Sequence, residues 1–279
     1  MDRLRVSGLG VGVELQLSGS RSGDLGGLLR SAWARCLDRP AELEADPITL
    51  SLETPAGASE PASPRGSAQI WTNDADSLMV MATQAVTAAL IKAQAGRLLM
   101  FHAGALSHPD TGASVVFVAP GGTGKTTLAR RLGHRYGYLT DETVGIDPAG
   151  RILPYPKPLS LRTEGAAYKR EFSPDDLGLL PAHPKPFVAR IIMIERSDLH
   201  QDDPVVEELP LLTAISGLAP ESSSLSSLDR GLHRCADLIE ATGPVLRVRY
   251  SEADGLLGLM SELVGGSPGT ASVRTAEER

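Results

Sequence analysis

Apolar and polar positions follow two different periods along this chain, and each period predicts a different kind of element. Apolar side chains alternate with polar ones in places over residues 4–17, and residues 48–53 read ITLSLE, so both segments are predicted strands. Residues 25–37 carry apolar side chains at helical spacing, which predicts a helix. We interpret residues 1–70 as a small N-terminal α/β unit that ends in a linker. That linker covers residues 54–68, where Pro, Ala, Gly and Ser occur without an apolar period.

The longer part of the chain, residues 71–265, continues the alternation of helical and strand patterns. A helical pattern over residues 76–95 precedes a strand at 97–106, and residues 113–119 (ASVVFVA) are continuously apolar, as in a central strand. An α/β domain with a mixed sheet is therefore expected, followed by a disordered tail over residues 266–279. Its further predicted elements are a helix over 123–137, strands at 138–147, 152–155, 188–195 and 245–250, and a helix at 254–264.

Charge and composition exclude several classes of protein. The chain of 279 residues has 27 Lys and Arg against 34 Asp and Glu, a net charge of -7, which argues against binding to nucleic acid or to an anionic membrane. Its longest apolar run, Leu78 to Ile91, is shorter than the roughly 20 residues that a membrane helix needs. Two distant cysteines, Cys36 and Cys235, form neither a disulfide scaffold nor a zinc motif. We expect a cytoplasmic protein without a membrane or nucleic-acid partner.

The segment from Ala119 to Thr126, APGGTGKT, is the clearest chemical signal in the sequence. It follows an apolar strand and opens an amphipathic helix, the context in which such a segment binds phosphate through backbone N–H groups. Lys125 would reach the β- and γ-phosphates and the Thr126 hydroxyl would bind Mg²⁺, so ATP and Mg²⁺ are the predicted ligands. The alternative is a glycine-rich turn that happens to precede a helix. The predicted nucleotide-binding residues are Pro120, Gly121, Gly122, Thr123, Gly124, Lys125, Thr126 and Thr127.

Phosphoryl transfer needs further groups, and three residues near the loop in sequence are candidates. Asp141 and Glu142 interrupt an otherwise apolar strand 16 and 17 residues after Lys125, so one helix and a turn return them toward the phosphates. Successive strand residues face opposite ways, so only one of the pair faces the nucleotide unless the strand ends there. The alternative for the pair is an exposed acidic turn. His102 lies in the strand before the loop strand, where it has either a functional or a structural hydrogen-bonding role.

The order His102-Ala-Gly-Ala, apolar strand, GGTGKTTLA and Asp141-Glu142 resembles the catalytic domain of the HPr kinase/phosphorylase family over about residues 97–200. The resemblance implies a P-loop kinase fold and transfer of the ATP γ-phosphate to a Ser or Thr hydroxyl of a protein or peptide. It also implies that Asp141 is the base, with His102 beside it, and that Glu142 helps to hold Mg²⁺. Since family members assemble as hexamers, a homo-oligomer is compatible with it.

The chain departs from that family in two places. The second acidic residue is Glu142 where the family usually has Asp, and the family's Gly-Ile-Ile-Asn signature is not recognisable, which puts phosphorolysis and HPr as the acceptor in doubt. In its place stands a proline-rich stretch, whose Lys157 and Arg162 we rank first as cations for the transferred phosphate. Arg196 ranks below them, and Glu195 is a secondary candidate for a Walker B carboxylate.

Three functions remain open from the sequence. The first is a kinase that modifies a protein or peptide, like the divergent kinases found with peptide-tailoring genes. The second is a kinase for a small hydroxyl compound, which would need a closed pocket beside Asp141 rather than an open groove. The third is a nucleotide-binding assembly or peptide-recognition factor that transfers nothing. The sequence names neither the acceptor nor the role of the N-terminal unit.

Overall fold

The computed structural model describes residues 2–37, 41–54, 68–163, 169–197 and 203–265, and it is a mixed α/β structure. Its contacts divide the chain into two compact units. Unit 1 contains residues 1–94 and 155–177, and unit 2 contains residues 95–154 and 178–279. The sequence-based boundary at residue 70 thus falls inside unit 1, because the following helix packs on the N-terminal sheet. The predicted tail at 266–279 and nearly all of the predicted linker lie outside the described residues.

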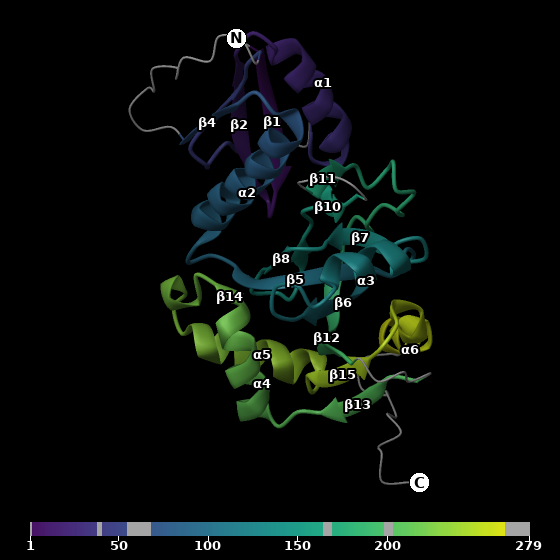
Figure 1. Cartoon of the computed structure of the whole chain (residues 1–279). Helices are drawn as coiled ribbons and strands as arrows, with labels where there is room; N and C mark the ends of the chain where they lie inside the picture. The colour runs from purple at the N-terminus through teal and green to yellow at the C-terminus, as the bar shows by residue number, and fades with distance from the viewer. Residues whose placement is uncertain (1, 38–40, 55–67, 164–168, 198–202, 266–279) are drawn as a thin grey trace. The chain divides into compact units, whose positions relative to one another are not determined.

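Unit 1 is built on a four-stranded sheet in the order β1-β2-β3-β4 (Figure 1). The alternating segment predicted as one strand is a hairpin, because Leu9 and Gly10 both have positive φ and reverse the chain in two residues. The third and fourth strands add in parallel. The strands are β1 (Asp2–Gly8), β2 (Val11–Ser18), β3 (Ile48–Leu52) and β4 (Ala68–Thr72).

Helices and a second small sheet complete unit 1. The helices are α1 (Ser22–Ala32), the 3-10 turn η1 (Ala34–Cys36) and α2 (Ala75–Gln94), and the sheet pairs β10 (Leu159–Arg162) with β11 (Lys169–Phe172). Tyr155 ties the later segment to the N-terminal part, since its hydroxyl lies 2.9 Å from the Thr87 hydroxyl and its ring lies against Gly8. This packing explains why residues 155–177 belong to unit 1 although residues 95–154 do not.

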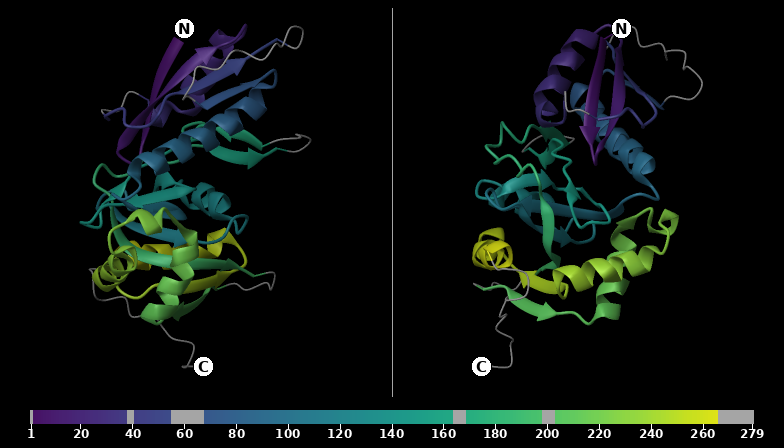
Figure 2. Two further views of the ribbon diagram at one scale, coloured as in Figure 1. Left: turned by 90° about the vertical axis from the view of Figure 1, so that its left-hand side faces the viewer. Right: turned by 180° about the vertical axis from the view of Figure 1, so that it is seen from behind.

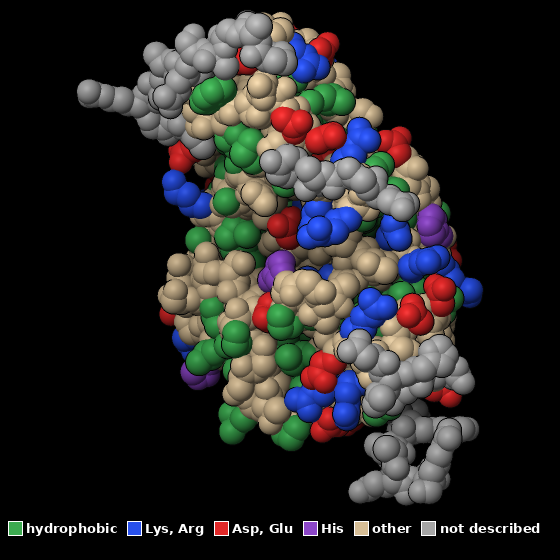
Figure 3. Space-filling model, viewed as in Figure 1, with side chains coloured by type: hydrophobic (Ala, Val, Ile, Leu, Met, Phe, Trp, Pro, Cys, Tyr) green, Lys and Arg blue, Asp and Glu red, His purple; other side chains and the backbone are tan. Residues whose placement is uncertain are grey.

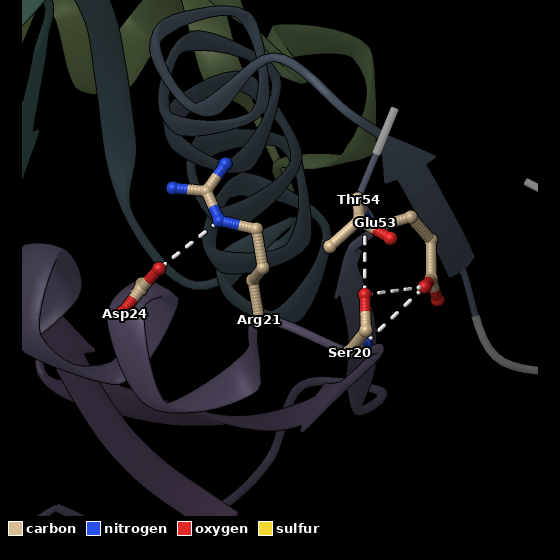
Figure 4. A network of polar contacts seen from close by, with 5 residues as sticks. All are labelled: Ser20, Arg21, Asp24, Glu53 and Thr54. Carbon is tan, nitrogen blue, oxygen red and sulfur yellow. Dashed lines mark hydrogen bonds and ion pairs between the residues drawn. The ribbon is translucent and has the colours of Figure 1, made fainter. Parts of the chain in front are cut away.

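A polar network fixes the turn that follows β2 (Figure 4). The Glu53 carboxylate accepts hydrogen bonds from the backbone N–H and the hydroxyl of Ser20 at 3.2 and 3.0 Å. The Ser20 oxygen in turn accepts one from the N–H of Thr54 at 2.9 Å, and Arg21 pairs with Asp24 in the first turn of α1. The backbone N–H of Ser20, then its hydroxyl and that of Ser51, lower the pKa of the Glu53 carboxyl by hydrogen bonding. The network therefore joins the end of β3 to the start of α1.

Unit 2 is built on a larger mixed sheet in the order β13-β15-β12-β6-β5-β8-β9. Strands β6, β12 and β15 run parallel, whereas β5 runs antiparallel to β6, β7 and β8. Its strands are β5 (Leu99–Ser107), β6 (Ala113–Val118), β7 (Gly137–Thr140), β8 (Thr143–Ile146), β9 (Ile152–Leu153), β12 (Phe187–Arg196), β13 (Val205–Glu208), β14 (Ser222–Ser223) and β15 (Leu246–Tyr250). The predicted strands at 97–106, 113–119, 188–195 and 245–250 are thus all present, within a few residues of their expected bounds.

Helices cover both faces of this sheet, with α4 and α5 on one side and α6 on the other (Figure 2). The helices are α3 (Lys125–Leu132), α4 (Leu211–Leu218), α5 (Gly231–Thr242) and α6 (Leu257–Gly265), with 3-10 turns η2 (Ala219–Glu221), η3 (Leu225–Ser227) and η4 (Ala253–Leu256). Between the sheet and α4 and α5 lies an apolar cluster that includes Phe101, Val116, Ile191 and Leu218. In the described part of the chain, no helix combines the length and hydropathy needed to cross a membrane.

Candidate functional site

The glycine-rich loop lies where the sequence predicts it, between the end of β6 at Val118 and the start of α3 at Lys125. Gly122 and Gly124 both have positive φ, 84° and 102°, a backbone shape that other residues rarely adopt. The loop is closed by a hydrogen bond from the Thr123 hydroxyl to the Pro120 carbonyl at 2.9 Å. At the level of the backbone, the segment is therefore a strand–loop–helix unit whose helix N-terminus follows the glycines directly.

Lys125 is held close to this loop rather than extended into solvent. Its side chain is only 6% exposed, and its Nζ donates hydrogen bonds to the carbonyls of Ala119 and Pro120. Burial lowers the pKa of Lys125, while the carboxylates of Glu221, Asp141 and Glu142 act in the opposite direction. The ammonium group therefore has the loop backbone on one side and three carboxylates near enough to influence its charge.

The pairing of β5 brings the other predicted residues to the same place. Ala103 pairs with Val118 at the last position of β6, and its N–H also donates to the carbonyl of Glu142 at 3.1 Å. One residue earlier, His102 pairs with Thr143, the first residue of β8. The end of β6, the acidic pair and His102 thus lie in adjacent rows of one sheet. Unit 2 therefore gathers the residues that the sequence separates by up to 40 positions.

The acidic pair occupies a break in the predicted strand over 138–147, which the structure divides into β7 and β8, both antiparallel to β5. β7 ends at Thr140 and β8 begins at Thr143, and the Thr140 hydroxyl oxygen accepts bonds from the N–H groups of Glu142 and Thr143 at 3.3 and 3.4 Å. Asp141 is 5% exposed, and its Oδ1 accepts a hydrogen bond from the Tyr138 hydroxyl at 2.9 Å. Because the strand ends here, the two carboxylates are freed from the alternation that would oblige them to face opposite sides.

His102 is half-buried, and its surroundings disfavour its protonated form. Its pKa is lowered first by burial and then by the positive charge of Lys125, against smaller opposing effects of Glu142 and Glu221. At neutral pH the imidazole is therefore predominantly neutral, so one ring nitrogen can accept a proton or a hydrogen bond.

Glu221 lies near His102 and Lys125, although no sequence pattern singled it out. It ends η2, and the next residue, Ser222, pairs with Phe101 on β5, which carries Glu221 to the level of His102. Its charge influences both His102 and Lys125. No motif surrounds Glu221 in the sequence, and it lies 80 positions from Asp141. Only the pairing of β14 with β5 brings it to the site.

The residues present fit a bound phosphate and a single magnesium ion. A Cβ at Gly121 or Gly122 would meet no atom within 4 Å, so the loop has open space beside its backbone. Thr126 and Glu142 are half-buried residues whose side-chain oxygens could act as metal ligands, whereas Thr127 is exposed. No cluster of three or more His, Cys, Asp or Glu side chains that could hold a metal occurs in the ranges described above. Such a sparse donor set suits Mg²⁺, which usually binds one or two protein groups together with phosphate oxygens and water.

Lys157 and Arg162, ranked first as phosphate cations, belong to unit 1 and not to the unit that carries the loop. Lys157 is 2% exposed, and its Nζ donates to the Pro158 carbonyl at 3.0 Å. Arg162 is exposed at the end of β10. The proline-rich, apolar setting that singled out Lys157 therefore buries its ammonium group within unit 1.

Unit 2 offers a different cation, Arg196, at the carboxyl end of β12. Its guanidinium pairs with Glu252 at 3.4 Å and donates to the Ser251 carbonyl at 3.2 Å. The neighbouring Glu195 pairs with Arg247 at 3.2 Å, which accounts for its charge without a role at the loop. Lys and Arg side chains are interspersed with Asp and Glu on the face drawn in Figure 3, in keeping with such pairs. Arg196 is therefore a unit 2 cation at the same edge of the sheet as the loop, three residues beyond Met193, which pairs with the last residue of β6.

A cavity of about 860 Å³ lies elsewhere in unit 2. It is lined by the turn 147–150, by the first residues of β12 and by the C-terminal end of α5, and it includes no residue of the loop. His102, Asp141 and Glu142 do not line it either. The candidate site is therefore defined by the convergence of β5, β6 and β8 and not by this cavity.

Comparison with known proteins gives little beyond this geometry. No protein-family model matches the chain, and no curated protein matches it. Among solved structures, the HPr(Ser) kinase/phosphatase from Coxiella burnetii is similar with a TM-score of 0.31 and 16% sequence identity, over 60% of this chain and 93% of that one. A TM-score and an identity this low carry no argument about the function of this chain.

Proposed function

We propose that unit 2 binds Mg²⁺-ATP on residues 120–127 and transfers the γ-phosphoryl group to a Ser or Thr hydroxyl of a protein or peptide. One observation carries the proposal. The register of β5 with β6 and β8 sets His102 and the Asp141-Glu142 pair beside the point where β6 enters the glycine-rich loop. A phosphate loop with a carboxylate beside it is the minimum that in-line phosphoryl transfer needs.

Each group has a role that its surroundings support. Lys125 would move from the loop carbonyls to the β- and γ-phosphate oxygens, since the same ammonium protons suit either acceptor. The Thr126 hydroxyl and Glu142 would hold Mg²⁺, which when bound neutralises charge on the phosphate oxygens. Arg196, at the carboxyl end of β12, would balance charge that develops during transfer.

The proposed step conserves atoms and charge. The acceptor oxygen forms a bond to the γ-phosphorus while the bond from that phosphorus to the β–γ bridging oxygen breaks, which releases ADP. The hydroxyl proton passes to the Asp141 carboxylate, which the Tyr138 hydroxyl holds in one orientation. His102, predominantly neutral, lies in the adjacent row and can accept a hydrogen bond from the acceptor hydroxyl.

The test separates nucleotide binding from transfer. Isothermal titration of Mg²⁺-ATP and Mg²⁺-ADP would be run on wild type, Lys125→Ala, Asp141→Asn and the control Lys185→Ala, which changes an exposed lysine of the same unit. Lys125→Ala removes charge-assisted hydrogen bonds and is expected to weaken Mg²⁺-ATP binding about tenfold or more. Asp141→Asn should bind as wild type does but transfer about 10² to 10⁴ times more slowly. Lys185→Ala should match wild type in both.

Transfer would be followed with γ-labelled ATP and two acceptor sets, a randomised library of Ser- and Thr-containing peptides and a panel of small hydroxyl compounds. Labelled peptide supports the proposal, and label only in small compounds would replace it with a small-molecule kinase. Binding without label in either set would favour a nucleotide-binding assembly factor. Absence of nucleotide binding in wild type would refute the proposal.

A further inference from the structure

The last strand of unit 2 ends next to the glycine-rich loop. β15 runs parallel to β12, which runs parallel to β6, so the carboxyl ends of all three strands meet at the same edge of the sheet. Ligands of parallel α/β sheets bind at this edge. Tyr250 is the final residue of β15 and pairs with Arg196, the final residue of β12. The topology therefore brings an aromatic residue from the end of the chain to the phosphate loop.

The Tyr250 side chain is directed at the loop itself. Its hydroxyl oxygen lies 3.5 Å from the position that a Cβ would occupy on Gly124, the residue that precedes α3. The side chain is buried, with 4% of the residue exposed. Its backbone carbonyl accepts a hydrogen bond from the N–H of Ser197, which helps to hold the end of β15 in place. A tyrosine with a buried ring usually directs its hydroxyl at a polar partner, and here the hydroxyl faces the glycine-rich loop.

The phenol is suited to donate to an anion. Burial is the first cause that raises the pKa of Tyr250, with Glu252 acting in the same direction and Arg196 against it, so the hydroxyl keeps its proton at neutral pH. A phosphate oxygen at Gly124 would provide the acceptor. The N-terminus of the eight-residue helix α3 contributes backbone N–H groups on the same side.

We propose that Tyr250 is a phosphate-binding residue whose phenolic O–H donates a hydrogen bond to a phosphate oxygen held beside Gly124. This inference rests on the proposed nucleotide site and adds to it a donor from a strand two places away in the sheet. The site then depends on the end of β15 as well as on the loop, because the ring position is fixed by the packing of that strand.

The test uses Tyr250→Phe, which keeps the buried ring and removes only the O–H. Mg²⁺-ATP and inorganic tripolyphosphate should each bind about tenfold more weakly, since a hydrogen bond to a charged group is lost. Adenosine, which has no phosphate, should bind as it does to wild type. The matched control is Tyr136→Phe, another buried tyrosine of unit 2, whose hydroxyl lies 2.8 Å from that of Ser261. It should leave all three affinities unchanged.

The outcomes distinguish this inference from the proposed function. If Lys125→Ala weakens Mg²⁺-ATP binding and Tyr250→Phe does not, Tyr250 is not a phosphate ligand and the nucleotide site stands. Equal weakening of adenosine and tripolyphosphate by Tyr250→Phe would indicate a purely structural role and overturn the inference. If wild type binds neither ATP nor tripolyphosphate, both proposals fail together. Circular dichroism spectra of the variants would verify that the fold is retained.

Discussion

The hydrogen bond between Tyr138 and Asp141 provides the sharpest test of the candidate site. Both residues are buried, and the Tyr138 hydroxyl lies 2.9 Å from Oδ1 of the carboxylate. A hydrogen bond to a charged group contributes about 1.5–3 kcal/mol, because a buried carboxylate that loses a donor is left poorly solvated. Tyr138→Phe should therefore lower the free energy of unfolding by about 1.5–3 kcal/mol. Tyr136→Phe removes a bond between two neutral hydroxyls and should cost only about 0.5–1.5 kcal/mol.

Urea unfolding followed by far-UV circular dichroism would measure both changes. Tryptophan fluorescence is unsuitable, because Trp33 and Trp71 both lie in unit 1 and the altered bond lies in unit 2. If Tyr138→Phe costs no more than Tyr136→Phe, the carboxylate does not depend on this bond and the reasoning is refuted. In transfer assays Tyr138→Phe should slow the step while Mg²⁺-ATP binding stays the same, because only the orientation of Asp141 changes.

Two further predictions concern the sheet that carries the site. In Gly104→Ala the new Cβ would overlap the ring of fully buried Phe117 on the paired strand, which should destabilise unit 2 by about 1–3 kcal/mol. The control Gly258→Ala, at an exposed position of α6, meets no atom and should not destabilise it. Equal urea midpoints for the two variants would contradict this prediction. The lowered pKa of His102 means that the unfolded chain takes up a proton first, so wild type should lose stability as the pH falls below 6.5. His102→Gln should show a shallower loss of stability between pH 7.5 and 5.5, and parallel stability curves for the two proteins would contradict a lowered pKa of His102.

The elements that the sequence predicted well are those with strong local periodicity. The helix now seen as α2 and the strands β5, β6, β12 and β15 agree with their predicted ranges within a few residues. The hairpin β1–β2 and the break at Asp141-Glu142 were each read as one strand, because apolar residues lie on both sides of each interruption. At Leu9 and Gly10 a two-residue turn reverses the chain between apolar flanks, and periodicity alone does not reveal it. At the acidic pair the chain keeps its direction, since β7 and β8 are both antiparallel to β5.

The residues of the candidate site also fall into two groups, those that local sequence patterns indicated and those that only the fold brought to the site. Local sequence alone determined the loop from Ala119 to Thr126, because glycines, a lysine and a threonine at fixed spacing before a helix act through their own backbone and side chains. It also pointed to His102 and Asp141, which lie within one or two elements of that loop. Their functional roles are still predictions, but their positions beside the loop are now part of the structure.

Only the tertiary structure decided which distant residues join them. Glu221 reaches the site through the pairing of β14 with β5, and Tyr250 reaches it because β15 is the second strand away from β6. Lys157 belongs to unit 1, where its Nζ donates to the Pro158 carbonyl, so its role as a phosphate cation is still a prediction. Such pairings depend on how the whole sheet buries its apolar faces, which involves residues more than 80 positions apart in the sequence. The sequence of a single segment therefore does not reveal which distant strands will pair.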